Sequence, residues 1–151
     1  MSLIFDTHAH YDDEAFDADR ETLLASMPEH GVGLILDPGC DLESSRRAVE
    51  LARTYPRVYA AVGWHPENCA PYTEDSLDAL RAWAREPKVV AIGEIGLDYY
   101  WEQNPPRELQ QRVLRDQLAL AQELDLPVIV HDREAHADSL AIVQEFPAVR
   151  G

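Results

Sequence analysis

Val89-Val90-Ala91-Ile92-Gly93 is the apolar run that points to the fold class, and Glu94 follows it directly. A short run that is apolar throughout is typical of a strand covered on both faces. Four comparable runs lie elsewhere in the chain, and helix-like segments separate all five; the four are 3–6, 32–36, 58–63 and 127–130. This alternation predicts repeated βαβ units and a parallel sheet, and therefore an α/β fold. Both a (β/α) barrel and an open doubly wound sheet fit the pattern.

The segments between the runs show the spacing of apolar residues that is typical of helices. We expect helices over 17–29, 42–54, 76–85, 107–124 and 139–146. Asp41 is placed to cap the second of these helices, and Pro105-Pro106 opens the fourth. His30 stands before Gly31 at a predicted helix end, which favours a capping role. Because no linker interrupts the pattern, residues 1–151 are expected to form a single domain.

The composition restricts the class of protein and its partners. The 151 residues include 28 acidic and 13 basic side chains, a net charge of −15, and 46 % are apolar, which predicts a globular chain with a core. No run approaches the roughly 20 apolar residues of a membrane-spanning helix. The absence of a basic leader and the presence of only two cysteines predict a cytoplasmic protein. The negative charge excludes an extensive basic surface for nucleic acid, so a phosphate-bearing substrate would be attracted locally by metal ions or a few arginines.

Polar side chains follow four of the five runs at the point where each run ends. His8 and His10 follow the first run, His65 the third, Glu94 the fourth and His131 the fifth. The carboxyl ends of parallel strands meet at one edge of the sheet, where the active sites of such folds lie. We therefore expect these side chains to converge.

The residue types at this edge suit a divalent cation. On an extended strand His8 and His10 point to the same face, and neutral imidazoles are good metal ligands. Glu94 needs a partner if it is buried, and one cation or two bridged cations would provide it. His131 is then a natural third imidazole. The alternatives are hydrogen-bonded histidines without a metal, and an ion pair between Glu94 and Arg133.

The remaining polar residues are assigned less specific roles. His65 lies at the same edge but follows a bulky tryptophan, so it is expected to line the pocket, with metal ligation as the less favoured alternative. Arg133 lies two residues beyond His131 and suits either a phosphate oxygen or a surface ion pair. His136 falls at a predicted helix start and is expected to be exposed.

Four motifs occur in a characteristic order: 5-FDTHAH-10, 63-GWHP-66, 93-GEIGLDYY-100 and 128-VIVHDREA-135. In this order they resemble the TatD family of metal-dependent deoxyribonucleases, within the amidohydrolase superfamily of TIM barrels. The resemblance extends from Ile4 to the last residue and implies a barrel of the (β/α)8 type, of which this chain holds about five βα units. It also implies a cytoplasmic enzyme with two divalent metal ions. The implied ligands are His8 and His10 for one ion, His131 for the other and Glu94 as the catalytic bridge, with His65 and Arg133 binding substrate.

The chain departs from the family in length, because such barrels have eight strands and about 250 residues. The family's histidine at the end of the sixth strand and its aspartate near the end of the eighth lie outside these 151 residues. The domain is therefore expected to be an incomplete barrel: a fragment, half of an assembly, or an inactive metal-binding chain.

For the complete barrel, the resemblance predicts hydrolysis of phosphodiester bonds at DNA ends or in small phosphodiesters, by an exonuclease-type reaction with a metal-activated water. Mg²⁺, Mn²⁺ and Zn²⁺ all suit the ligand set. The alternative is hydrolysis of a small amide, lactone or ester, as in other members of the superfamily. Those relatives often use a carboxylated lysine, whereas Lys88, the one lysine here, lies at the wrong end of its strand.

Overall fold

The computed structural model describes residues 3–151 and contains one parallel sheet of five strands. Each strand pairs with the next one in the chain, so the spatial order is β1-β2-β3-β4-β5. The strands are β1 (Ile4–Asp6), β2 (Val32–Pro38), β3 (Val58–Val62), β4 (Val89–Asp98) and β5 (Val128–Arg133). A doubly wound sheet reverses its strand order at a switch point, whereas a barrel adds strands in sequence. The sequential strand order therefore identifies the sheet as part of a barrel and excludes a doubly wound sheet.

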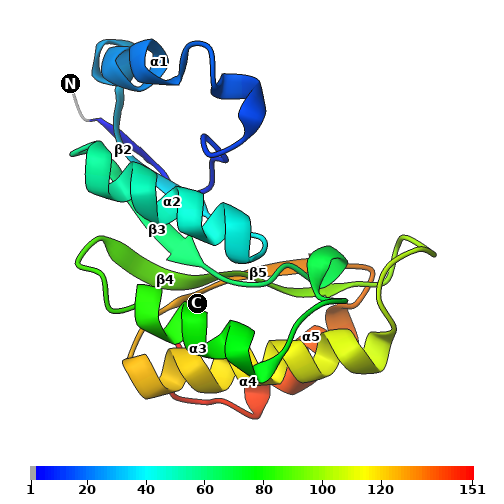
Figure 1. Cartoon of the computed structure of the whole chain (residues 1–151). Coiled ribbons are helices and arrows are strands. Elements are labelled where there is room, and N and C mark those ends of the chain that lie inside the picture. Colours follow the sequence, from blue (N-terminus) through cyan, green and yellow to red (C-terminus); the bar gives the residue numbers. More distant parts are fainter. Residues whose placement is uncertain (1–2) are drawn as a thin grey trace.

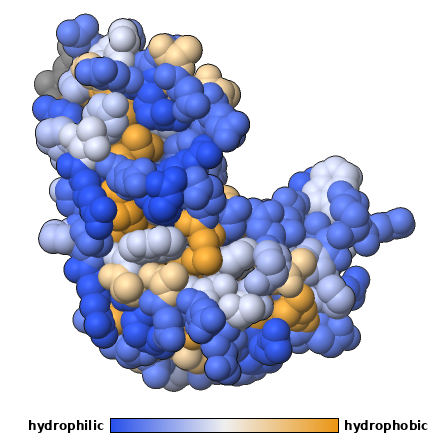
Figure 2. Space-filling view, in the orientation of Figure 1, coloured by the Kyte–Doolittle hydropathy of each residue, from blue (hydrophilic) through white to orange (hydrophobic). Residues whose placement is uncertain are grey.

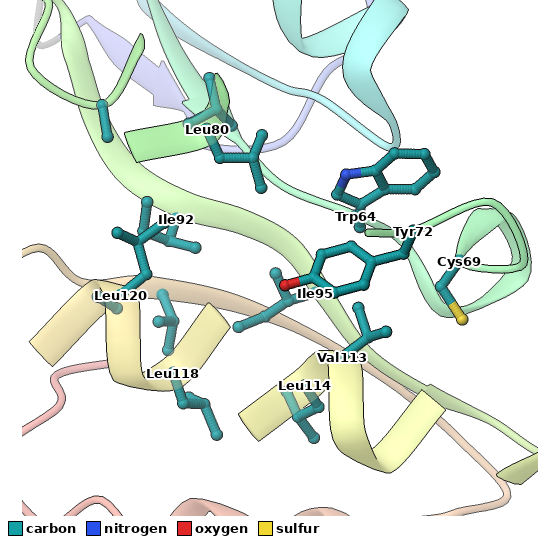
Figure 3. Close-up of a cluster of buried hydrophobic side chains, with 14 of the residues drawn as sticks. Trp64, Cys69, Tyr72, Leu80, Ile92, Ile95, Val113, Leu114, Leu118 and Leu120 are labelled. Carbon is teal, nitrogen blue, oxygen red and sulfur yellow. The ribbon is translucent and has the colours of Figure 1, made fainter. Parts of the chain in front are cut away.

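The helices confirm this choice, because α2 to α5 pack on the same face of the sheet (Figure 1). The helical segments are η1 (Glu14–Phe16), α1 (Arg20–Ser26), η2 (Met27–His30), α2 (Leu42–Thr54), η3 (Pro66–Asn68), α3 (Glu74–Trp83), α4 (Arg107–Leu124) and α5 (His136–Gln144). In Figure 3, Ile92 and Ile95 of β4 face Leu114 and Leu118 of α4 across the main core. This layer corresponds to the outer wall of a barrel, so the fold is a curled half-barrel.

The opposite face of the sheet is the side that lines the interior of a barrel. A small cluster of Leu36, Ala61 and Ala91 packs there, with Tyr59 and Ile129 at its margins. Strands β2, β3 and β4 are largely buried, but Phe5 of β1 and Val130 of β5 are exposed. The expectation that all runs are covered on both faces was therefore wrong for β1 and β5, because each has a neighbouring strand on one side only. Figure 2 shows apolar residues at the surface between polar ones.

Local capping explains which helix boundaries were predicted well. The predicted bounds of α2 and α4 are correct, and Asp41 caps α2 with its side chain accepting from the Ser44 N–H. Helix α3 begins at Glu74, two residues early, because Thr73 forms a capping box that the apolar spacing does not reveal.

Two other helices depart from their predicted limits. The segment predicted over 17–29 is an α-helix only from Arg20 to Ser26 and then a 3₁₀ turn, because Pro28 has no N–H to donate. His30 closes this turn as predicted, with Nδ1 3.0 Å from the Ser26 carbonyl oxygen. Helix α5 begins at His136 rather than 139. Within residues 3–151, no helix has the length and apolar character needed to cross a bilayer.

Candidate metal centre

The first two histidines lie in the loop that follows β1. The strand ends at Asp6, so His8 and His10 do not share the extended strand that their spacing suggested. Their side chains nevertheless converge, with the two Nε2 atoms 3.2 Å apart. The predicted convergence is therefore correct, although the loop produces it instead of a strand.

Glu94 lies inside β4 rather than at its end, because β4 continues to Asp98. Pairing between β3 and β4 stops at Val62 and Ile92, so Glu94 extends beyond the edge of its neighbour β3. The Glu94 N–H donates to the Gly39 carbonyl at 2.7 Å, which fixes the backbone where the register of β4 and β5 shifts. Glu94 therefore projects into the loops at the carboxyl edge even though its own strand continues.

The two carboxylate oxygens of Glu94 face different pairs of histidines. Oε2 lies 3.1 Å from His8 Nε2 and 3.9 Å from His10 Nε2. Oε1 lies 3.3 Å from His131 Nδ1 and 3.9 Å from His65 Nε2. Two groups of three donors, which share Glu94, therefore have ligand atoms close enough together to hold a metal ion.

His131 is held from behind by Asp98, a residue to which the sequence assigned no role. Asp98 is fully buried, and its Oδ2 lies 3.0 Å from His131 Nε2. If Nε2 carries the proton and donates it to Asp98, Nδ1 presents its lone pair toward Glu94, which suits a metal ligand. The hydrogen bond to Glu94, aided by that to Asp98, outweighs burial and raises the pKa of His131 above its ordinary value. The sequence carries no clear signal for this role, because Asp98 lies beyond Gly93, where the predicted strand ends.

His65 has the opposite arrangement. It precedes η3, and its Nδ1 accepts the Glu67 N–H at 3.3 Å, so in the neutral ring the proton is on Nε2. Burial, together with the nearby His131, lowers the pKa of His65 to about 4, so the ring is neutral near pH 7. A neutral ring with an Nε2–H group directed at Glu94 is better suited to donate a hydrogen bond than to bind a metal.

The backbone next to Glu94 is packed too closely for any side chain. A Cβ on Gly96 would lie 1.9 Å from the His131 carbonyl oxygen, and Gly96 has a φ of +144°. A Cβ on Gly93 would lie 2.7 Å from Ile129 Cβ. The glycines on both sides of Glu94 therefore permit a close approach of β5.

A buried pair of carboxylates, Asp12 and Asp37, lies behind His10 and was not predicted from the sequence. The Asp12 N–H donates to Asp37 Oδ2 at 3.1 Å, and Asp12 Oδ1 lies 3.9 Å from His10 Nδ1. Burial, reinforced by the neighbouring Asp12 carboxylate, raises the pKa of Asp37 to about 8. No pattern in the sequence pairs these two aspartates, because they are 25 residues apart.

Arg133 lies at the same edge but outside both groups of ligands. Its guanidinium stacks on the exposed ring of Tyr100, with Cζ 4.0 Å from the ring centroid. The ionic neighbours of Glu94 among residues 3–151 are histidines, so the alternative of an ion pair with Arg133 is not supported. His136 is exposed, as expected, and its Nδ1 lies 2.7 Å from Asp132 Oδ2.

The donor set fits a divalent cation. Burial alone would raise the pKa of Glu94, but the hydrogen bond with His131 and the nearby His65 and His8 together hold it below its ordinary value. Glu94 is therefore an anion near neutral pH, and imidazole nitrogens surround it. Mixed nitrogen and oxygen ligands of this kind suit Mg²⁺, Mn²⁺ and Zn²⁺ to different degrees.

Several known proteins resemble this chain in sequence. Residues 5–151 match the model of the family described as TatD related DNase. The chain is 41 % identical over 143 residues to the uncharacterized metal-dependent hydrolase YabD of Bacillus subtilis, covering 95 % of this chain and 56 % of YabD. It is 40 % identical to the 3'-5' ssDNA/RNA exonuclease TatD of Cronobacter turicensis, covering 95 % of this chain and 54 % of that protein.

A solved structure of a relative has the same fold as this chain. The crystal structure of YJJV, a TatD homologue from Escherichia coli K12, superposes with a TM-score of 0.88 at 39 % identity. That match covers 95 % of this chain and 56 % of YJJV, so the chain spans about half the length of the relatives it matches. The sequence, the half-barrel and the histidine–glutamate arrangement agree: the chain belongs to the TatD-related DNase family.

Proposed function

We propose that this chain carries the first part of the active site of a metal-dependent phosphodiesterase that shortens DNA from its ends. One observation carries the proposal: the two oxygens of Glu94 face separate pairs of imidazoles. A carboxylate in this position suits two cations that share it as a bridge. Two-metal sites of this kind are used to hydrolyse phosphodiesters, because they stabilise both the attacking and the leaving oxygen.

Each ligand has a defined role in this proposal. His8 and His10 would hold one ion together with one oxygen of Glu94, and His131 would hold the other together with the second oxygen. When bound, the ions supply Lewis acidity at the phosphorus and to the attacking water. Because His131 must lose a proton to become a ligand, metal affinity rises with pH through the raised pKa of His131.

The other side chains of the site bind and orient. Asp98 fixes the ring of His131, and Asp12 faces the far nitrogen of His10. His65 directs a neutral Nε2–H group toward the centre, where it donates a hydrogen bond to a phosphate oxygen of the substrate. These groups bring no additional cationic charge to the site.

The net charge of −15 favours a substrate that enters by one end. An acidic surface repels the body of a nucleic acid, whereas bound cations locally reverse the potential. The relatives named as 3'-5' ssDNA/RNA exonucleases support end-directed cleavage. The native substrate is therefore a DNA end or a short phosphodiester, and the cytoplasm remains the predicted location.

The test is metal-dependent cleavage of a 5'-labelled single-stranded oligonucleotide by the purified protein with Mn²⁺, Mg²⁺ or Zn²⁺. We expect stepwise shortening from the 3' end that a chelator abolishes. Glu94→Gln should lower the rate by more than the about 10–100-fold caused by loss of a residue that only supports a ligand. Glu145→Gln is the matched control, because this exposed carboxylate pairs with Arg115 on the outer surface.

Two results would contradict the proposal. Turnover of a carboxylic ester at least equal to that of a phosphodiester would favour ester or amide chemistry. Metal binding without any turnover would indicate a chain that only binds metal.

A further inference from the structure

Two exposed aromatic rings follow β4 directly, at the edge of the sheet that carries the metal ligands. Tyr100 is 46 % exposed and Trp101 41 %, and their ring centroids lie 4.5 Å apart. The loop that carries them projects beyond the end of the sheet (Figure 1). Large aromatic side chains in contact with one another and with water, beside a site, are typical of a binding surface.

Arg133 adds a third flat group to this cluster. Its Cζ lies 4.0 Å from the Tyr100 ring centroid and 5.1 Å from that of Trp101. Seven other arginines form ion pairs with carboxylates: Arg20, Arg46, Arg47, Arg53, Arg81, Arg115 and Arg150. Arg133 has no such partner among residues 3–151, although acidic side chains outnumber basic ones by 28 to 13. Its charge is therefore available for an anion that is not part of the chain.

The aromatic cluster is joined to the metal centre through Asp98. One oxygen of that buried carboxylate contacts His131 Nε2 at 3.0 Å, and the other accepts the Tyr100 N–H at 3.0 Å. The Tyr99 N–H in turn donates to the Arg133 carbonyl at 3.0 Å. Since Trp101 is three residues from Asp98, their Cα atoms are at most about 11 Å apart. The rings therefore lie within reach of a nucleotide next to a phosphate at the metal centre.

We propose that Tyr100, Trp101 and Arg133 form a stacking platform for the terminal bases of a single-stranded nucleic acid. This inference rests on the proposed function and specifies its substrate: a strand end whose bases are free to stack. The rings and the guanidinium plane accept base faces, and Arg133 donates to the phosphate between them. Bases within a duplex are stacked on each other, so a paired end offers only the outer face of its last base pair, whereas a single strand offers the faces of successive bases.

The negative charge of the protein explains why binding should rely on stacking rather than on many phosphate contacts. Proteins that bind strands through phosphates need many lysines and arginines, and this chain is acidic. Stacking supplies affinity without a basic surface. Binding through one arginine predicts a weak salt dependence, with a slope of log K against log[salt] of about −0.7 per contacted phosphate.

The experiment measures the affinity of the metal-loaded protein for two phosphorothioate oligothymidylates by fluorescence anisotropy. One oligonucleotide is intact, and the other lacks the bases of its two 3'-terminal nucleotides. We expect the intact strand to bind about 5- to 150-fold more tightly for each stacked base. Trp101→Ala and Tyr100→Ala should remove most of this difference, whereas Trp101→Phe should retain it. Leu140→Ala, an exposed apolar residue on α5, is the matched control.

The fluorescence of the wild-type protein provides an independent signal. Trp64 is buried and Trp83 half-buried, so quenching by the intact strand reports chiefly on Trp101. The platform would be refuted if Trp101→Ala bound both strands as the wild type does, or weakened both equally. If the wild type shortens single strands but does not distinguish the two probes, the platform fails and the proposed function stands. If the wild type neither binds nor cleaves single strands, both fail.

Discussion

Replacing Asp98 with asparagine tests how the metal centre is held together. Asp98 Oδ2 faces His131 Nε2 at 3.0 Å, and Oδ1 accepts the Tyr100 N–H at 3.0 Å. Asparagine keeps one oxygen for Tyr100 but places an amide donor opposite His131. The imidazole must then carry its proton on Nδ1 to accept from that amide. Nδ1 is the atom that faces Glu94, so the variant directs an N–H group at the position that the metal ion should occupy.

The size of the effect follows from the burial of the contact. Because Asp98 is fully buried, water cannot replace the lost acceptor. Loss of the partner that orients a ligating histidine costs about 10–100-fold in metal affinity, or roughly 1.4–2.7 kcal/mol. The same change removes one of two carboxylates that raise the pKa of His131, so that pKa should fall in the metal-free variant.

Titration calorimetry with Mn²⁺ or Zn²⁺ measures the affinity, and NMR of the metal-free protein measures the pKa of His131. Asp132→Asn is the matched control, because Asp132 Oδ2 contacts His136 Nδ1 at 2.7 Å on the outer surface. The control should leave metal affinity within about two-fold, since exposed ion pairs contribute little. Equal affinities for wild type and Asp98→Asn, with an unchanged pKa of His131, would refute the role of Asp98.

Three further predictions test the fold around the site. Gly96→Ala forces a Cβ to 1.9 Å from the His131 carbonyl and should prevent native folding or greatly lower the melting temperature; Gly31→Ala, at φ +88° with nothing within 4 Å, should cost only about 1–3 kcal/mol of backbone strain. In the folded protein Asp37 has a pKa of about 8, whereas in the unfolded chain its pKa is about 3.9. Between these two pH values the unfolded chain loses the proton and the folded protein keeps it. The free energy of unfolding should therefore fall as the pH rises, by up to about 1.4 kcal/mol per pH unit. Asp37→Asn should flatten this slope, which urea unfolding from pH 5 to 9 would measure. Leu114→Ala opens a cavity beneath β4 and should cost about 2–5 kcal/mol by urea unfolding.

Periodicity and capping predicted most of the fold. The five apolar runs became the five strands, and α2 and α4 have their predicted limits. The choice between barrel and doubly wound sheet could not be made from the runs alone, because it depends on strand order and on which face the helices cover. The resemblance to a family supplied that choice, and the sequential strand order confirmed it.

The site was predicted where its residues carry a recognisable chemical signal. His8, His10, Glu94 and His131 converge as expected, and His65 joins them. Their assignment as ligands stays a prediction, as does the role of residues 1–151 as a single domain.

The residues that support the ligands gave no such signal. Asp98 and Asp37 are single aspartates whose partners, His131 and Asp12, lie 33 and 25 positions away in the chain. Aspartate is also common in turns, so sequence alone gives no reason to place either one behind a ligand. The length of β4 was missed for a related reason: glycine and glutamate interrupt its apolar pattern, but pairing with β5 carries the strand past Glu94 to Asp98.

If the chain acts as proposed, its acidic surface and the cations at the carboxyl edge would together select the part of a nucleic acid that can bind. Each phosphate that approaches the surface away from the site would meet a net charge of −15, while a phosphate at the carboxyl edge would meet Arg133 and the cations bound around Glu94. Repulsion therefore rises with every nucleotide that lies along the surface, whereas the attraction is limited to the edge. A strand that binds by its end gains the attraction and avoids most of the repulsion. Under the proposed function, the excess of acidic residues therefore favours strand ends over strand interiors as substrates.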